Sequence, residues 1–271
     1  MGLFRYLLLT GLLFFCGHAH AETALINGVD LDFEIRGAGP PVYLLHGGME
    51  SRKSYDALAP ALAGDFTVVA LDSREQGRSG PADAQISYAL MASDLLALAD
   101  HLGHERFSIV GLSDGGITAL TAALRTPERV DRLVLLGAVY HFEAYPEETR
   151  KFIAQFEWDG DVDPQTYPGI FVEHYLTGRD DLSGFGVLLR EMATMWTTSP
   201  TFEQSDLSRV TAKTLVVNGD RDDVPLNHVV ELYDGLPDAQ LFIVPGGTHY
   251  ALQEKPALVN GAISTFLTAS R

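Results

Sequence analysis

The chain has 271 residues, 46% of them hydrophobic, which is enough for a sizeable core and ordinary for a single α/β domain. Its 36 acidic and 19 basic residues give a formal net charge of −17, which argues against nucleic acid and anionic membranes as partners because both bind basic patches. No internal repeat, low-complexity tract or linker divides the sequence, so we expect one domain.

The first 21 residues are typical of a secretory signal peptide. Their apolar run ends at Phe15 and is too short for a membrane-spanning helix, which needs about 20 residues. The segment Ala19-His20-Ala21 has the small residues of a signal peptidase site, so we expect cleavage before Glu22 and a bacterial periplasmic or secreted protein without stable membrane insertion. A lipoprotein anchor on Cys16 is the alternative, although Phe15 stands where a small residue is expected. Since Cys16 is the only cysteine, the mature chain would have no disulfide.

Residues 22–271 are expected to form the folded domain. Residues 23–36 predict a β-hairpin, because Asn27-Gly28 supplies a tight turn between alternating apolar and polar flanks. The following apolar runs are continuous, as in strands buried on both faces of a parallel sheet, and lie at residues 42–45, 66–71, 107–110 and 133–136. Helices are expected between them at residues 55–62, 88–102 and 116–125. This alternation predicts a doubly wound, mostly parallel α/β sheet.

The alternation pauses at about residues 138–205, which are rich in aromatic residues and methionine. We expect a helical cap insertion here, which packs a small core of its own, lays an apolar roof over a site on the sheet, or does both. The sheet pattern resumes with strands at 213–217 and 240–244 and helices at 227–236 and 256–268. Pro256 opens the last helix, where its missing N–H is tolerated.

The strand at 107–110 leads into Gly111-Leu112-Ser113-Asp114-Gly115. This is the G-x-S-x-G pattern of a nucleophile elbow, in which a strand turns sharply into a helix and presents the serine hydroxyl at the turn. Glycines beside the serine let strand and helix pack closely. A serine hydroxyl is a weak nucleophile at neutral pH, so it needs a base and a group that orients the base.

His249 is the candidate base. It follows the last strand in the loop Pro245-Gly246-Gly247-Thr248, at the strand end where open α/β sheets gather functional groups. The other histidines lie in the signal segment, near the end of a helix, in the cap insertion or at the start of a helix. For the orienting acid, three aspartates compete after the strand at 213–217, namely Asp220, Asp222 and Asp223.

With these motifs, residues 22–271 resemble the α/β-hydrolase superfamily, most of all the small one-domain serine hydrolases that include carboxylesterases, enol-lactone hydrolases, cofactor-free haloperoxidases and amino-acid ester hydrolases. The chain order of serine, aspartate and histidine also matches that fold. Four motifs carry the resemblance: His46-Gly47-Gly48, the turn at residues 72–79, the elbow at 111–116, and Gly219-Asp220-Arg221-Asp222 with Gly247-Thr248-His249. Glu75 and Gln76 depart from the family's pattern, which usually has glycine and histidine there, and this places the local turn in question.

The resemblance implies Asp222 as the orienting acid, with Asp223 as the fallback, and an oxyanion hole formed by the backbone N–H groups of Gly48 and Asp114. It implies that Ser113 attacks a carbonyl while His249 takes its proton. Serine at this position disfavours the relatives that open epoxides or carbon–halogen bonds, which have aspartate there. We expect the Asp114 side chain to stabilise a helix N-terminus rather than to bind a cationic substrate.

The sequence thus predicts a hydrolase of a small ester, lactone or thioester. No ligand-spaced residues indicate a metal and no Gly-rich loop indicates a nucleotide, so we expect neither metal nor cofactor, and a small molecule as the substrate. Amide or peptide cleavage, hydrolysis of a carbon–carbon bond, perhydrolysis and a non-catalytic binding role stay open as alternatives. The sequence does not determine the oligomeric state.

Overall fold

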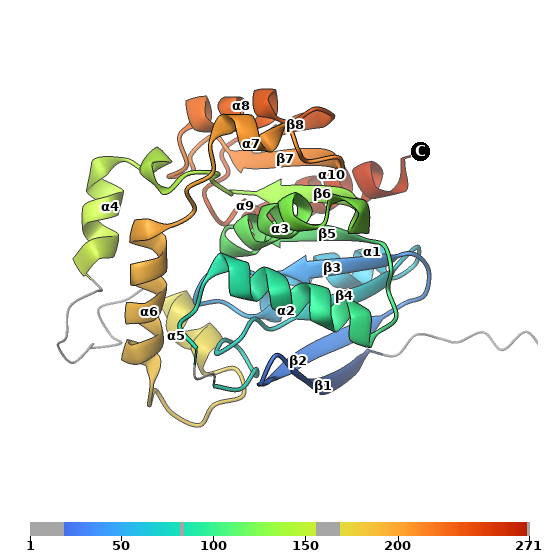
Figure 1. Ribbon diagram of the computed structural model, residues 1–271, viewed down its shortest axis with the longest axis vertical. Coiled ribbons are helices and arrows are strands. Elements are labelled where there is room, and N and C mark those ends of the chain that lie inside the picture. Colours follow the sequence, from blue (N-terminus) through green and yellow to red (C-terminus); the bar gives the residue numbers. More distant parts are fainter. Residues whose placement is uncertain (1–18, 82–83, 156–168, 270–271) are drawn as a thin grey trace, which may run out of the picture.

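The computed structural model describes residues 19–81, 84–155 and 169–269. Eight strands form one sheet in the order β1-β2-β4-β3-β5-β6-β7-β8 (Figure 1). Strand β2 pairs antiparallel with β1 and β4, and all other neighbours are parallel. The strands are β1 (His20–Ile26), β2 (Val29–Arg36), β3 (Pro41–Leu45), β4 (Thr67–Leu71), β5 (Phe107–Leu112), β6 (Val130–Leu136), β7 (Lys213–Gly219) and β8 (Ala239–Val244). The prediction of a doubly wound, mostly parallel sheet is confirmed.

The antiparallel pair at the start of the sheet is the predicted hairpin. Asn27 and Gly28 form its turn with φ angles of 48° and 81°, the left-handed region that asparagine and glycine tolerate. Strand β1 begins at His20, and Ala21 pairs with Glu34. The predicted cleavage site therefore lies within β1, while residues 1–18 of the predicted signal peptide lie outside the described residues, so the signal peptide stays a prediction.

Helices cover both faces of the sheet and divide the core in two. One core lies between the sheet and the α2, α3 and α8 helices, and the other lies between the sheet and α1, α9 and α10 (Figure 1). Continuous apolar strands supply side chains to both cores, which explains why they lack the alternation of a half-exposed sheet. The bounds of these helices are α1 (Leu58–Leu62), α2 (Tyr88–His101), α3 (Asp114–Arg125), α8 (Leu226–Gly235), α9 (Ala251–Glu254) and α10 (Pro256–Thr268).

Two predicted helices have different bounds in the structure. The predicted helix at 55–62 is a 3-10 turn, Arg52–Tyr55, followed by the short α1. Pro60 has no N–H with which to bond the carbonyl four residues before it, so one continuous helix is unfavourable there. Helix α3 begins at Asp114, two residues earlier than predicted, because the elbow places its sharp turn at Ser113 itself.

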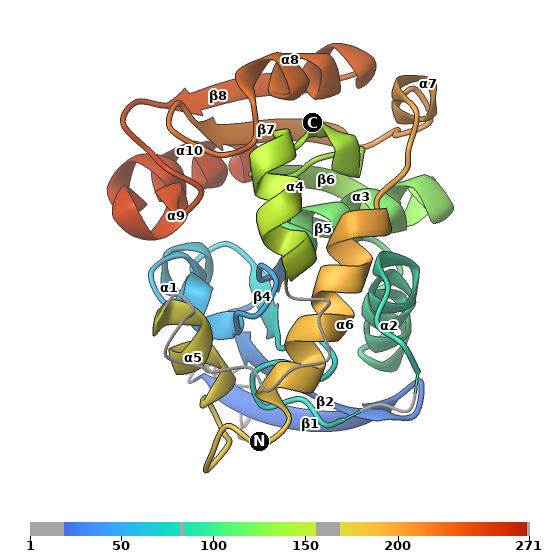
Figure 2. The same cartoon turned by 90° about the vertical axis from the view of Figure 1, so that its left-hand side faces the viewer.

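The predicted cap segment contains α4 (Glu147–Ala154), α5 (Gly169–Tyr175), α6 (Phe185–Thr198) and α7 (Gln204–Leu207), together with the 3-10 turn Phe142–Ala144. Figure 2 shows α4, α5 and α6 in front of the sheet. A β-bridge between His141 and Thr201 joins the two ends of the segment. The segment is therefore helical where it is described, and its exact limits at about 138–205 stay a prediction.

Within the described ranges, no helix has both the length and the apolar character required to cross a membrane.

Candidate active site

Ser113 stands at the junction of β5 and α3 in a strained conformation. Its φ of 51° and ψ of −116° lie outside the regions that residues with a side chain normally occupy. Its backbone N–H donates a 2.7 Å hydrogen bond to the carbonyl of Leu136, at the end of the neighbouring strand β6. Strain of this kind persists only where the surrounding structure fixes it, and it is concentrated at functional sites.

The glycines of the elbow allow α3 to start against the sheet. A Cβ on Gly115 would lie 1.9 Å from the carbonyl oxygen of Leu45, and a Cβ on Gly111 would lie 2.3 Å from the carbonyl oxygen of Gly115. Both contacts are with backbone atoms, which cannot rotate away as a flexible side chain can. The elbow therefore requires glycine at both positions.

We expect Gly115→Ala to lower the free energy of unfolding by more than about 3 kcal/mol, because the added methyl forces β3 and α3 apart. Gly261→Ala is the matched control, since this glycine lies within α10 and a Cβ there meets nothing within 4 Å. The control should be neutral or gain up to about 1 kcal/mol from improved helix propensity. Urea unfolding followed by circular dichroism measures both, and equal stabilities for the two variants would contradict the described packing.

His249 and Asp222 meet at the carboxyl ends of β8 and β7. Nδ1 of His249 lies 2.9 Å from Oδ1 of Asp222, and the same oxygen accepts a 3.0 Å bond from the backbone N–H of Val224. The Asp222 side chain is only 2% exposed. Asp220 has another role, because its Oδ1 accepts a bond from the N–H of Gly246 and so ties the two loops together. Of the three candidate aspartates, Asp222 is the one hydrogen-bonded to His249.

The surroundings of His249 favour its protonated form. Burial alone would lower the pKa of the imidazole, but the hydrogen bond and the charge of Asp222 outweigh it, with smaller contributions from Glu50 and Asp223. The pKa of His249 is therefore raised above its ordinary value. If Nδ1 donates to the carboxylate, the Nε2 lone pair is free to accept a proton.

Ser113 lies beside this pair but is not bonded to it. Among the hydrogen bonds of the described residues, none joins the Ser113 hydroxyl to His249. Gly137, next to the hydrogen-bond partner of Ser113, lies against the pair: a Cβ on it would be 3.0 Å from Nδ1 of His249 and 3.2 Å from Oδ2 of Asp222. Bonds between nucleophile and base are often long in free enzymes and shorten in the substrate complex.

The loop after β3 carries the predicted oxyanion residue Gly48. His46, at the start of this loop, is buried. Its Nδ1 lies 2.7 Å from the carbonyl oxygen of Gly47, and its Nε2 accepts a 2.9 Å bond from the N–H of Ser73, which requires a neutral ring. Burial lowers the pKa of His46, consistent with the neutral form. The N–H of Met49 donates a 2.7 Å bond to Oε1 of Gln76. His46 and Gln76 thus fix the loop from both sides.

The two departures from the family's turn are accommodated in the structure. Glu75 adopts a φ of 63°, the conformation for which glycine is usual, and Gln76 supplies the acceptor for Met49. The turn is further held by Asp72, whose Oδ1 accepts a 2.7 Å bond from the N–H of Arg52. The departures therefore leave the turn intact.

The side chain of Asp114 connects three helices. Its Oδ1 accepts a 2.8 Å bond from the Tyr88 hydroxyl in α2, and its Oδ2 accepts a 2.7 Å bond from Nε1 of Trp196 in α6. Burial raises the pKa of Asp114 to about 6, against the opposing effect of these two hydrogen bonds. Although Asp114 lies in the first turn of α3, as expected, both of its oxygens are occupied by tertiary partners that the sequence did not indicate.

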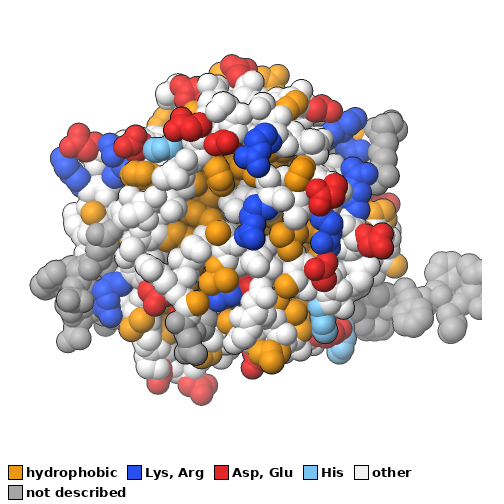
Figure 3. Space-filling model, in the orientation of Figure 1, with side chains coloured by type: hydrophobic (Ala, Val, Ile, Leu, Met, Phe, Trp, Pro, Cys, Tyr) orange, Lys and Arg blue, Asp and Glu red, His pale blue; other side chains and the backbone are white. Residues whose placement is uncertain are grey.

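Residues of the cap lie close to Gly48 in the loop after β3. A Cβ on Gly48 would lie 2.3 Å from Oδ2 of Asp114, 2.6 Å from Cζ2 of Trp196 and 2.9 Å from Cε of Met192. Figure 3 shows hydrophobic side chains around a hollow between α6 and α3, with acidic and basic side chains intermingled over the rest of this face. The aromatic and methionine content of residues 138–205 predicted apolar contacts of this kind, and Met192 and Trp196 of α6 make them at Gly48.

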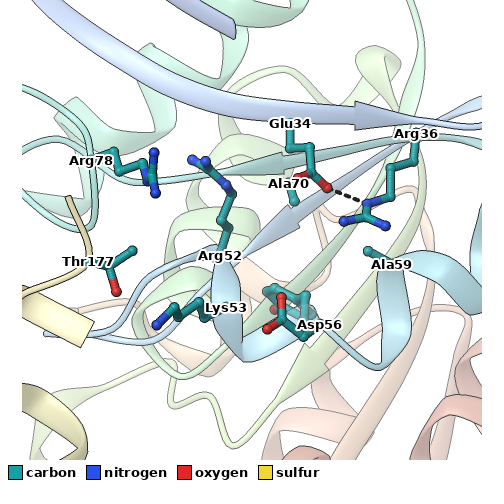
Figure 4. Close-up of a pocket in the computed structure, with 10 residues that line it drawn as sticks. Glu34, Arg36, Arg52, Lys53, Asp56, Ala59, Ala70, Arg78 and Thr177 are labelled. Atoms are coloured by element: carbon teal, nitrogen blue, oxygen red, sulfur yellow. Dashed lines mark hydrogen bonds and ion pairs between the residues drawn. The ribbon is translucent and has the colours of Figure 1, made fainter. Parts of the chain in front are cut away.

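A cavity of about 210 Å³, whose lining does not include Ser113, lies between β2, the 3-10 turn Arg52–Tyr55 and the cap (Figure 4). Of the four basic residues that line it, Arg36 pairs with Glu34, and Arg52 pairs with Asp32 and Asp72. Ser113, His249 and Asp222 do not line this cavity. In the part of the chain that the structure describes, no group of three or more histidine, cysteine, aspartate or glutamate residues is placed to hold a metal ion.

A mostly parallel eight-stranded sheet with a strained serine at a strand-to-helix elbow defines the α/β-hydrolase fold. Residues 40–166 match the family described as alpha/beta hydrolase fold, and residues 186–271 match the one described as TAP-like protein. The chain belongs to the α/β-hydrolase family and is a hydrolase.

Three similar proteins illustrate the chemistry within this family. The chain is 31% identical over 266 residues to a putative carbamate hydrolase from Rhizobium rhizogenes, covering 88% of this chain and 98% of that protein. It is 30% identical over 280 residues to 2-hydroxy-6-oxo-6-phenylhexa-2,4-dienoate hydrolase from Comamonas testosteroni, covering 91% and 96%. The structure of carboxylesterase CesB from Bacillus subtilis superposes with a TM-score of 0.76 at 22% identity, covering 94% and 93%, and shares the fold.

Proposed function

We propose that this protein is a serine hydrolase that cleaves a small ester, lactone or thioester through an acyl-enzyme on Ser113, with His249 as the base and Asp222 as its orienting acid. The observation that supports this most is the 2.9 Å contact between Nδ1 of His249 and Oδ1 of Asp222, at the same sheet edge as the strained serine. The position of the pair accords with the base and acid that a serine nucleophile needs.

In the proposed first half-reaction, the Ser113 hydroxyl adds to the substrate carbonyl as its proton passes to Nε2 of His249. The imidazolium that forms is stabilised by the buried Asp222 carboxylate. The oxyanion is proposed to accept hydrogen bonds from the backbone N–H groups of Gly48 and Asp114, each typically worth about 2.7–4 kcal/mol in such a site. His249 then protonates the leaving group, and the acyl-enzyme is left.

In the second half-reaction, water replaces the alcohol or thiol. His249 takes a proton from the water as it adds to the acyl carbonyl. The tetrahedral intermediate then collapses with cleavage of the bond to Ser113 Oγ, and His249 returns its proton to that oxygen, so the acid is released and both Ser113 and His249 regain their initial state. The apolar side chains of Met192 and Trp196 beside the oxyanion loop would exclude bulk water from the acyl group. A small, partly apolar acyl group fits this arrangement.

Hydrolysis of a carbon–carbon bond is the second candidate. It is favoured by the 30% identity, along nearly the full length of both chains, to a 2-hydroxy-6-oxo-6-phenylhexa-2,4-dienoate hydrolase. Carbamate cleavage is a third chemistry on the same scaffold, represented by the relative from Rhizobium rhizogenes. Fold alone does not choose among these bonds, so a panel of substrates must.

The test combines a covalent probe with such a panel. A fluorophosphonate should label the purified protein once, and peptide mass spectrometry should locate the label on Ser113. Turnover should be fastest with a short p-nitrophenyl ester or a lactone, and slower with an aryl carbamate, an anilide and a vinylogous 1,5-diketone. Fastest turnover of the diketone would establish the carbon–carbon hydrolase instead, and absence of both labelling and turnover would favour a binding protein.

Export is proposed on the sequence of residues 1–21. The N-terminus of the protein recovered from a bacterial periplasmic or secreted fraction should be Glu22. A recovered chain that still begins at Met1 would contradict cleavage.

A further inference from the structure

Asp114, the residue after the candidate nucleophile, carries a buried carboxyl group whose two oxygens have partners on different helices. Its Oδ1 accepts the 2.8 Å hydrogen bond from the Tyr88 hydroxyl in α2, and its Oδ2 accepts the 2.7 Å bond from Nε1 of Trp196 in the cap helix α6. Asp114 itself is the first residue of α3. The bond between Asp114 and Trp196 therefore joins the nucleophile elbow directly to the cap.

The same pair of side chains lies against the oxyanion loop. The Cβ that Gly48 lacks would come within 2.3 Å of Oδ2 of Asp114, 2.6 Å of Cζ2 of Trp196 and 2.9 Å of Cε of Met192. The volume beside the Cα of Gly48 is thus filled by the carboxylate, the indole and the methionine side chain. The hydrogen bond that joins the elbow to the cap therefore also fixes what lies next to Gly48.

The bond between Asp114 and Trp196 is of a strong kind. Asp114 is only 4% exposed, so a donor or acceptor that loses its partner there does not regain it from water. Burial raises the pKa of Asp114, but only to about 6, so at neutral pH the group is the carboxylate that accepts at both oxygens. Hydrogen bonds to an ionised acceptor are stronger than neutral ones. A tie between α2 and α3 alone would need only the Tyr88 bond, whereas the second bond holds a side chain of the cap.

We propose that Asp114 is a positioning residue whose side chain fixes the Trp196 indole beside Gly48, and that the fixed indole limits the length of the acyl group that the site accepts. This inference rests on the proposed function, in which the oxyanion of the substrate lies at the N–H of Gly48. An acyl group bound there would extend past the indole of Trp196 and the side chain of Met192. An indole held in place leaves room for a short acyl chain, and an indole free to rotate leaves room for a longer one.

The test compares two substitutions of Asp114 that keep the shape of its side chain. Asp114→Leu removes both acceptors, whereas Asp114→Asn keeps an acceptor for the indole and can donate its amide N–H to the Tyr88 hydroxyl. The measurement is the ratio of kcat/KM for p-nitrophenyl octanoate to that for p-nitrophenyl acetate. In Asp114→Leu the ratio should rise at least about fourfold, the gain from burying one further methylene group. In Asp114→Asn it should return to within about twofold of wild type, since the bond is restored.

Tyr88→Phe is the matched control. It removes the hydrogen bond to the other oxygen of the same carboxylate and leaves the bond to Trp196, so the ratio should stay within about twofold of wild type. If Asp114 were merely structural, Asp114→Leu would lower kcat/KM for both esters equally, and an unchanged ratio would overturn the proposal. An equal rise in Tyr88→Phe, or a loss in Asp114→Leu confined to esters that carry an ammonium group, would overturn it too.

A second variant breaks the same bond from the side of the cap. Trp196→Phe removes the N–H and also shortens the ring, so it should raise the ratio by itself. Adding Asp114→Leu to Trp196→Phe should change the ratio by less than about twofold more, because the bond that it breaks is already absent. Effects of the two substitutions that multiply in the double variant would show that they act independently, and would overturn the proposal.

The indole N–H of Trp196 reports the bond without any turnover. The chain has two tryptophans, so the indole signal that is lost in Trp196→Phe identifies the one to follow by NMR. Its exchange with deuterium should be at least about tenfold faster in Asp114→Leu than in wild type, as expected when a bond to a charged acceptor is lost. Equal exchange rates would overturn the proposal even if esters are hydrolysed. Faster exchange in a protein without turnover would support the fixing of Trp196 by Asp114 and count against the proposed function, together with the chain-length limit that rests on it.

Discussion

Ser113→Ala should lower kcat for a short p-nitrophenyl ester by about 10⁴-fold or more, because it removes the hydroxyl that is proposed to form the acyl-enzyme. The residual rate should come from the oxyanion donors and substrate binding, which act without the nucleophile. Steady-state kinetics with the purified variant measure the loss. Fluorophosphonate labelling of the same sample should disappear, which separates loss of the nucleophile from a general loss of binding.

The folding of this variant provides its control. The Ser113 hydroxyl accepts and donates no hydrogen bond among the described residues, whereas the backbone bond to Leu136 stays in place with alanine. The free energy of unfolding should thus differ from that of the wild type by less than about 1 kcal/mol, as for other substitutions that break no named interaction. A well-folded variant with a tenth or more of the wild-type kcat would refute Ser113 as the nucleophile.

The parts of the fold that could be predicted are those fixed by local pattern. Continuous apolar runs located six parallel strands. Five of these strands are buried on both faces, so they cannot alternate, whereas β8 lies at the edge of the sheet and is only partly buried. The final helix has the predicted bounds, since Pro256 fixes its start. The prediction of one continuous helix at 55–62 was wrong because Pro60 has no N–H for the backbone hydrogen bond to the residue four positions before it. The hydrophobic pattern does not show this constraint.

The parts of the site that could not be predicted depend on contacts between distant segments. Asp114 receives its hydrogen bonds from Tyr88 and Trp196, which come from a different helix and from the cap. The local sequence pattern located the candidate nucleophile and the candidate base, since each follows a strand end within a distinctive motif. The local sequence pattern did not indicate the hydrogen-bond partners of the side chains around Ser113 and His249.

The choice among Asp220, Asp222 and Asp223 also depends on a contact between distant segments, which the sequence does not reveal. All three follow β7, and the pattern of residues alone left the choice open. The structure directs Asp222 at His249 because Asp220 is held by the N–H of Gly246 in the facing loop. The conformation of the turn thus determines which of the three carboxylates faces the imidazole, and hydrogen bonds between the two loops fix that conformation.

The adjacent aspartates offer a direct test of the orienting acid. Asp222→Asn should lower kcat/KM by about 10³- to 10⁴-fold, because the amide keeps the volume of the side chain but loses the charge that stabilises the imidazolium. The acid limb should also move to lower pH, since the hydrogen bond and charge of Asp222 are what raise the pKa of His249 above its ordinary value despite burial. The pH profile of kcat/KM records both effects at once.

Asp223→Asn changes the same charge one residue further along and should keep kcat/KM within about threefold of wild type, as expected for an exposed carboxylate that makes no bond to His249 in the described structure. The two variants have the same net charge and the same composition, so a difference between them reflects only position. A large loss in Asp223→Asn with near-normal activity in Asp222→Asn would transfer the orienting role to Asp223. Equal losses in both would mean that the total charge of the turn, and not the hydrogen bond to His249, controls the imidazole.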